Sequence, residues 1–170
     1  MIRNATIEDA TEIARIHVQT WQRAYVDIVP QSHLQGLSVE KRAAVWSDNL
    51  SRTTAGTLVA EENGEIAGWI GFGPSRDEGA RNAGEIYAAY VDMDSWGRGH
   101  GRELMEQAEA QLWSQGFYTI TLWTFERNVR TRAFYARAGY SPDGERKTLA
   151  IGGQELWVLR YVKRAAQPFG

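Results

Sequence analysis

The residues whose types and spacing point most directly to a ligand follow an apolar run over residues 86–93. That run predicts a buried strand, and a tight turn follows it. Gly97, Gly99 and Gly101 come next, where an amphipathic pattern predicts a helix over about 99–114. A glycine-rich turn that opens a helix aims several backbone N–H groups at one spot, beside the positive end of the helix dipole. The segment therefore predicts a phosphate or pyrophosphate site, and we expect Gly101 to leave room for the ligand.

Three known patterns could supply such a site. The dinucleotide pattern G-x-G-x-x-G does not fit, because Arg102 stands where the third glycine should be. The P-loop pattern G-x-x-x-x-G-K-[ST] is absent. Residues 91–102, a strand ending in Val-x-Met-Asp and then Arg-Gly-x-Gly, resemble the coenzyme A signature of the GNAT superfamily of N-acetyltransferases. Trp96 replaces the usual Gln or Arg of that signature. A turn that merely tightens a strand–helix connection is the bland alternative.

A second block, Asn-Val-Arg-Thr-Arg-Ala-Phe-Tyr-Ala-Arg-Ala-Gly-Tyr over 128–140, resembles the same superfamily. Thr131 and Tyr140 depart from its pattern. Asn128 is a good N-cap and Gly139 a good helix stop. Asn128 and Tyr135 lie seven residues apart, so two helical turns place them on one face, about 10 Å apart along the axis. One helix could then contact a long thioester ligand at two points.

The resemblance implies an α/β fold with a mixed, mostly antiparallel sheet that is splayed between its fourth and fifth strands and covered by helices on both faces. It also implies acetyl-CoA as co-substrate, with its pantetheine arm paired to the fourth strand. Carried over by position, the cofactor-binding residues are Val91, Met93, Arg98, Gly99, His100, Gly101, Arg102 and Asn128. For His100 an exposed turn position is the stronger alternative, and each arginine could simply be solvated.

Tyr135 is the expected acid for catalysis. A phenol stays protonated at neutral pH, so it can donate a proton or hydrogen bond to the departing thiolate. Glu85, at the start of the predicted fourth strand, could accept the proton of the amine through a water, or be a strand-edge carboxylate. The residues expected at the acceptor pocket are Trp21, Tyr25, Arg76 and Tyr87. No nucleophilic triad or cysteine is present, so the resemblance implies direct attack of an amine on the thioester.

Periodicity and turn residues predict one domain over residues 1–162 and a C-terminal tail over 163–170. Thr6 and Asp9 open a helix that runs to about residue 24, and Ser38 caps a second helix to about residue 49. Asn63-Gly64 predicts a tight hairpin. The predicted strands cover residues 2–4, 57–61, 65–72, 85–93, 117–125, 147–151 and 155–162.

Composition excludes several classes. A chain of 170 residues with net charge −2 does not suit a nucleic-acid binder, and without cysteine it has no disulfide or thiolate site. Three histidines far apart in sequence predict no metal site. Neither a signal peptide nor a membrane span is visible, so a cytoplasmic protein is expected. The leading function is acetylation of a small-molecule amine. Acetylation of a protein N-terminus or lysine, and a non-catalytic acyl-CoA sensor, are the alternatives, and a homodimer is left open.

Overall fold

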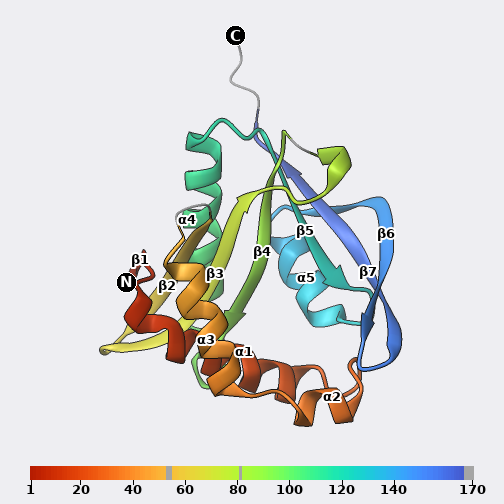
Figure 1. Ribbon diagram of the computed structural model, residues 1–170. Coiled ribbons are helices and arrows are strands. Elements are labelled where there is room, and N and C mark those ends of the chain that lie inside the picture. The colour runs from red at the N-terminus through yellow and green to blue at the C-terminus, as the bar shows by residue number, and fades with distance from the viewer. Residues whose placement is uncertain (53–54, 81, 167–170) are drawn as a thin grey trace.

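A single seven-stranded sheet organises the computed structural model, which describes residues 1–52, 55–80 and 82–166 (Figure 1). The strand order is β1-β2-β3-β4-β5-β7-β6. The strands are β1 (Ile2–Asn4), β2 (Gly56–Glu62), β3 (Glu65–Pro74), β4 (Gly84–Val91), β5 (Thr119–Phe125), β6 (Ser141–Ile151) and β7 (Gln154–Arg164). The α-helices are α1 (Ala10–Ala24), α2 (Gln31–Gln35), α3 (Val39–Leu50), α4 (His100–Ser114) and α5 (Val129–Arg137). Short 3-10 turns cover Ile7–Asp9, Glu78–Ala80 and Met93–Ser95.

Strands β4 and β5 form the one parallel pair in this sheet, and they stay together only briefly. Their register runs from Gly84 opposite Ile120 to Ile86 opposite Leu122, and it stops there. On its other side, β4 stays paired with β3 as far as Val91. Figure 1 shows the two strands diverging after their short contact. The sheet is therefore mixed, mostly antiparallel and splayed between the fourth and fifth strands, as the sequence predicts.

A bulge in β4 changes which side chains face which layer. Phe72 of β3 pairs with Ile86, and the preceding Gly71 pairs with Ala88, so Tyr87 is the additional residue. Ile86 joins the core under α4, whereas Ala88 packs with the cluster on the α1 and α3 face. Tyr87 and Ala88 line one cavity on that second face. A strictly alternating strand would place consecutive residues on opposite faces.

Local sequence signals explain why the helices and the hairpin begin where they do. The Thr6 N–H donates to the Asp9 carboxylate at 2.7 Å, in a capping box at the start of α1. Ser38 accepts the backbone N–H of Lys41 at the start of α3. Asn63, at φ 54°, and Gly64, at φ 84°, form the turn between β2 and β3. Positive φ at both positions is what a two-residue hairpin turn requires.

Helices cover both faces of the sheet (Figure 1). On one face, α4 and α5 pack against the sheet and contribute Leu104, Leu112 and Tyr135 to the largest core cluster. On the other face, α1 and α3 pack over β3 and β4 around Ile13, Ile16 and Trp69. The apolar stripe expected on the helix after the glycine turn is buried as predicted, at Leu104, Met105, Ala108 and Leu112.

Gly101 belongs to this packing rather than to an open space. A Cβ added to Gly101 would lie 3.4 Å from the Phe134 ring and 3.5 Å from Cγ2 of Val91. These are ordinary van der Waals distances, so a methyl group would fit there, whereas a larger side chain would press on Phe134 and Val91. The expectation that Gly101 leaves room for a ligand stays a prediction.

Some predictions need correction at element boundaries. The strand expected over 85–93 ends at Val91, since Met93 lies in a 3-10 turn. Its residues from Tyr87 onward are only half-buried, because β5 no longer covers their edge. The short helix α2 was not predicted, and β6 begins at Ser141 rather than near 147. β7 extends to Arg164, two residues into the expected tail, whose residues 167–170 lie outside the described part of the chain.

Replacing Gly101 with valine is expected to destabilise the fold, because two methyl groups would press on Phe134 and Val91. Overpacking of this kind costs about 1–3 kcal/mol in free energy of unfolding, which denaturant titration measures. Gln107→Val is the matched control, because Gln107 is exposed on the same helix. Equal unfolding free energies for the two variants would contradict this account of Gly101.

His17 on α1 gives a prediction about pH. It stacks among Trp21, Trp69 and Tyr90, and burial, with the positive charge of Arg42, lowers the pKa of His17 from 6.5 to about 4. The unfolded state therefore binds more protons between these pKa values. The stability from neutral His17 is fully present above pH 6.5 and is lost as pH falls towards 4, by about 3 kcal/mol at most.

His17→Phe keeps an aromatic ring and removes this titration. We expect its unfolding free energy to fall less steeply than that of the wild type between pH 6.5 and 4, the range set by the two pKa values. Denaturant titrations at a series of pH values give both curves. Parallel curves over this interval would show that His17 does not titrate with a lowered pKa.

Candidate active site

The N-terminus of α4 presents backbone N–H groups that no side chain among the described residues caps. Its N-cap is Gly99, at φ 91°, and Gly97 before it has φ 80°. α3 and α5, by contrast, begin at residues whose side chains accept a backbone N–H, Ser38 and Asn128. A Cβ on Gly99 would meet no described atom within 4 Å, so the turn is open on its outer side. The first amides of α4 can therefore bind an anion.

The end of β4 next to this turn is partly occupied by the protein itself. The Trp96 indole donates to the Val91 carbonyl at 2.9 Å, and the Trp96 backbone N–H donates to the Met93 carbonyl at 3.3 Å. Val91 and Met93 were both predicted to offer backbone groups to the cofactor. Each of these carbonyls already accepts one hydrogen bond from Trp96, and the role of Val91 and Met93 in cofactor binding stays a prediction.

Arg130 of α5 is a residue of this region that the sequence analysis missed. Its guanidinium lies 3.6 Å from the centroid of the Trp96 ring, so it brings a positive charge to the glycine turn from across the splayed strands. The signal was present in the second block, two residues after Asn128. Nothing in the sequence alone, however, showed that this arginine reaches the turn.

The charged residues of the turn differ in their exposure to solvent and in their partners. Arg98 is exposed and pairs with Glu62 at 2.7 Å, and Arg102 is exposed and pairs with Glu106 at 3.1 Å. His100 is buried, which corrects the expectation of an exposed turn residue. Neither ring nitrogen of His100 has a hydrogen-bond partner in the structure, and its Nε2 lies 3.5 Å from the Glu62 carboxylate.

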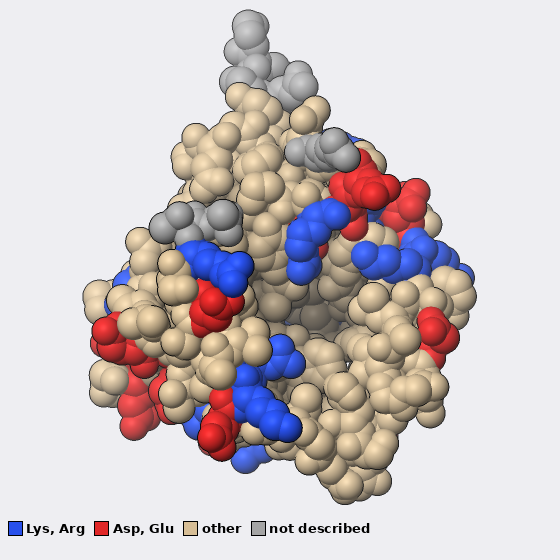
Figure 2. Space-filling model, viewed as in Figure 1, with Lys and Arg blue, Asp and Glu red and all other residues tan. Residues whose placement is uncertain are grey.

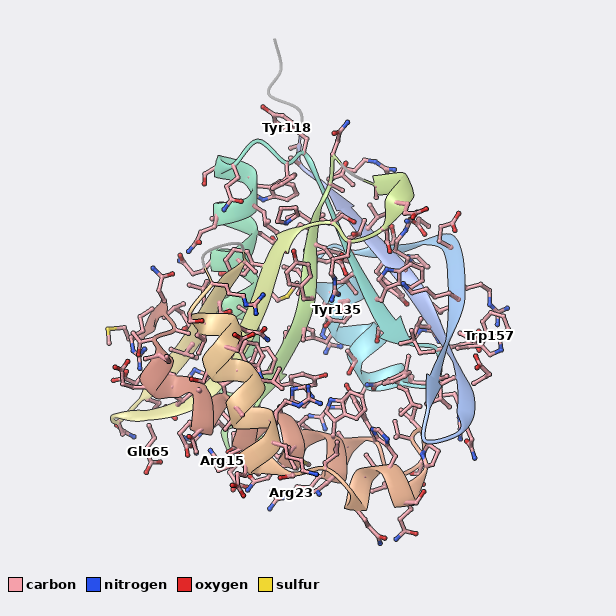
Figure 3. All side chains as sticks on the ribbon, in the orientation of Figure 1. Arg15, Arg23, Glu65, Tyr118, Tyr135 and Trp157 are labelled. Carbon is pink, nitrogen blue, oxygen red and sulfur yellow. The ribbon has the colours of Figure 1, made fainter. Side chains whose placement is uncertain are left out.

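Helix α5 places Asn128 and Tyr135 as predicted. The Asn128 side-chain oxygen caps the helix by accepting the Thr131 N–H at 3.2 Å, which leaves its amide NH₂ available. Tyr135 is 7% exposed and lies between α5 and β4, at the centre of the molecule in Figure 3. Burial, followed by the influence of Tyr90, raises the pKa of Tyr135 above its usual value. Its hydroxyl therefore keeps its proton at neutral pH.

Trp21 and Tyr25, two residues predicted for the acceptor pocket, pack in an aromatic cluster with Phe125 and Tyr90. The Trp21 indole donates to the Tyr90 hydroxyl at 2.8 Å. Tyr25 is buried against Phe125, and burial, with Tyr90 and Tyr135 nearby, raises the pKa of Tyr25. Trp21 and Tyr25 thus form, with Tyr90 and Phe125, one group of packed aromatic side chains. Neither lines the cavity described next.

A cavity of about 500 Å³ opens on the α1 and α3 face of the sheet. Its walls include Trp46 of α3, Trp69 of β3, and Arg76 and Tyr87, two residues predicted for the acceptor pocket. Figure 2 shows this face of the molecule hollowed near its centre, with Lys or Arg side chains at the edge of the hollow. The cavity lies on the face of the sheet opposite to the core under α4.

Glu85 does not line this cavity. It is 2% exposed, and both of its oxygens bind Arg76: the backbone N–H donates to Oε2 at 2.8 Å and Nη2 donates to Oε1 at 2.7 Å. A carboxylate with both oxygens engaged in this way fixes the guanidinium in front of it. The geometry therefore places Glu85 behind Arg76, and its predicted role as base stays a prediction.

Among the described residues, no group of three or more His, Asp or Glu side chains is arranged to hold a metal ion. None of the described helices combines the length and the apolar character needed to span a membrane.

Comparisons with known proteins agree with this geometry. A model of the acetyltransferase (GNAT) family matches residues 13–140, more than half of the chain. A Bacillus subtilis protein named as an uncharacterised N-acetyltransferase, YuaI, is 33% identical over 143 residues, which cover 84% of this chain and 79% of that protein.

Solved structures share the fold. A ribosomal-protein-alanine N-acetyltransferase from Brucella melitensis aligns over 97% of this chain and 99% of its own, with TM-score 0.76 and 24% identity. A PaiA N-acetyltransferase from Thermoplasma acidophilum, in complex with coenzyme A, aligns over 97% and 98%, with TM-score 0.74 and 18% identity. By its splayed sheet, its glycine turn and the family model that spans most of it, the chain belongs to the acetyltransferase (GNAT) family.

Proposed function

We propose that this protein transfers an acetyl group from acetyl-CoA to the primary amine of a small molecule by direct attack. The observation that carries this proposal is the joint position of three features around β4. They are the uncapped amides of α4, the buried hydroxyl of Tyr135 and the cavity on the opposite face of the sheet. An enzyme that joins two substrates must bind both at one reacting centre, and β4 contributes residues to both faces of the sheet.

The residues present fit acetyl-CoA as co-substrate, which supplies an activated acetyl thioester. Gly99 leaves the α4 amides open to a pyrophosphate, and Arg98, Arg102 and Arg130 add positive charge around the turn. The edge of β4 after Ile86 has lost β5, so its free backbone groups can pair with the amides of an extended arm. The Asn128 amide can donate to that arm from α5.

Tyr135 acts in this proposal as the donor that stabilises the leaving thiolate. Its phenol is protonated at neutral pH because burial disfavours the charged form. A donor held in a low-dielectric environment stabilises developing negative charge more strongly than water does. A purely binding protein has no need of such a group.

The size of the cavity favours a small acceptor. A volume of about 500 Å³ lies within the range of small-molecule sites, and the lining converges from α1, α3, β3 and β4. An assay of thiol release from acetyl-CoA with a panel of small amines and of N-terminal peptides tests this choice. We expect turnover with small amines. Turnover confined to peptides would replace the proposal with protein acetylation, and a thermal shift with coenzyme A but no turnover would identify a sensor.

The Tyr135→Phe variant tests the chemical role of the hydroxyl. It removes one O–H and keeps the ring, so packing and cofactor affinity should be retained, while kcat falls roughly 10- to 1,000-fold. Steady-state kinetics on an active amine, together with coenzyme A affinity, measure the two effects. Tyr140→Phe is the matched control, since it removes another buried hydroxyl just after the same helix. An unchanged kcat, where chemistry limits turnover, would remove Tyr135 from the mechanism.

A further inference from the structure

The charges that line the acceptor cavity have one sign. Three arginines, Arg42, Arg52 and Arg76, contribute to its lining, and no Asp or Glu does among the described residues. Arg52 pairs with Asp48 at 2.8 Å and Arg76 pairs with Glu85 at 2.7 Å, whereas Arg42 has no ion pair within the described part of the chain. An amine that enters as an ammonium meets a net positive surface there. This surface is unfavourable for a simple amine cation and favourable for an acceptor that also carries a negative charge.

Arg42 brings its charge to the inner wall of the cavity. It is half-buried on α3, and its positive charge contributes to lowering the pKa of His17 on α1 and acts on Tyr90 of β4. Both neighbours are uncharged at neutral pH, since the pKa of His17 falls to about 4 and burial raises that of Tyr90. The guanidinium therefore faces neutral groups on α1 and β4. An anionic ligand would give it a partner.

Arg76 is held in position by a buried anchor. Its guanidinium lies 4.3 Å from the centroid of the Tyr87 ring and donates to Glu85 beneath it. Only Nη2 is used in that pair, so Nε and Nη1 are free to donate to a ligand. The Tyr87 hydroxyl donates in turn to the Pro74 carbonyl at 2.6 Å, which fixes the ring under the guanidinium. Arg76 is thus a positioned donor, although its side chain is 64% exposed.

The remaining walls are apolar and aromatic. Trp46 and Trp69 meet edge to face with centroids 4.6 Å apart, and Leu50 and Val45 of α3 complete that side. Such a surface binds an aliphatic or aromatic side chain by burying it. The cavity therefore combines an apolar wall with two guanidinium groups that a planar carboxylate matches.

We propose that the acceptor is an amine that also carries a carboxylate and an apolar side chain, with the carboxylate bound by Arg42 and Arg76. The inference rests on the proposed function, and it names the acceptor class of that same cavity.

The first test compares acceptors that differ only in charge. Thiol release from acetyl-CoA is measured with leucine and leucinamide, and with phenylalanine and phenylalaninamide. The amine of each amide loses its proton more readily, so chemistry alone favours the amides. We expect the free amino acids to have kcat/KM roughly 10- to 100-fold higher, the range for a charge-assisted hydrogen bond. Equal or better turnover of the amides would overturn this inference and leave the acetyltransferase proposal standing.

A second test removes the arginine charge. Arg42→Gln should raise KM for the amino acids roughly 10- to 100-fold and should not raise KM for the amides, for which the change removes a repulsive charge. Lys41→Gln is the matched control, because it removes the same charge from the neighbouring exposed position on α3. Thermal melting and coenzyme A affinity confirm that both variants fold. A loss shared by amino acids and amides, or one reproduced by Lys41→Gln, would contradict a specific contact with the carboxylate.

Glu85→Gln separates the two roles open to that residue. If Glu85 positions Arg76, the change raises KM for the amino acids, leaves kcat nearly constant and spares the amides. If Glu85 is instead the base, kcat falls for every acceptor and the pH dependence of kcat loses its acidic limb. The second pattern would overturn the positioning role assigned here. Absence of turnover with every amine, despite coenzyme A binding, would instead reject the proposed function.

Discussion

The loss of pairing between β4 and β5 after Ile86 is the constraint on which the rest of the structure depends. A strand in the middle of a sheet normally forms backbone hydrogen bonds with both neighbouring strands. From Tyr87 to Val91, β4 has one neighbour, so one row of its N–H and C=O groups is left for something other than the sheet. The glycine turn, the uncapped start of α4 and Tyr135 all lie along or just beyond this row.

The bulge at Tyr87 determines which residues of β4 face each side of the sheet. Residues after it on one face pack with α4 and α5 around Tyr135. On the other face, Tyr87 and Ala88 line the cavity with α1 and α3. A ligand bound along the edge of β4 and a ligand bound in the cavity would therefore approach the same strand from different sides. The position of the charged residues follows this division, with arginines at the turn and arginines in the cavity.

Local signals in the sequence predicted the parts of the fold that local physics decides. Asn63-Gly64, Ser38 and Asn128 each fix a turn or a cap through their own backbone or side chain, and each was found as expected. The family resemblance supplied the splayed sheet. Helix α2 was missed because five residues carry too little periodicity to be recognised. The first half of β6 was missed because its residues are exposed and show no apolar pattern.

The candidate site was predictable only in part. Tyr135 and Asn128 lie on one helix, so their spacing was enough. Whether His100 is buried, whether Trp21 faces the cavity and what binds Glu85 depend on contacts between distant segments, which spacing cannot give. Arg42 carried no signal at all, since an arginine on a helix surface is usually solvated. Its place in the lining of the cavity follows only from how α3 packs against the rest of the fold.

Amide hydrogen exchange, followed residue by residue with and without saturating coenzyme A, tests most directly whether the free edge of β4 binds the cofactor. The account predicts slower exchange for amides of β4 after Ile86 and for the first amides of α4, because hydrogen bonds to a ligand protect them. Amides of β2 and β3 should change little, as they are already paired within the sheet. Binding of coenzyme A without added protection along β4, or with protection confined to the cavity under α3, would contradict it.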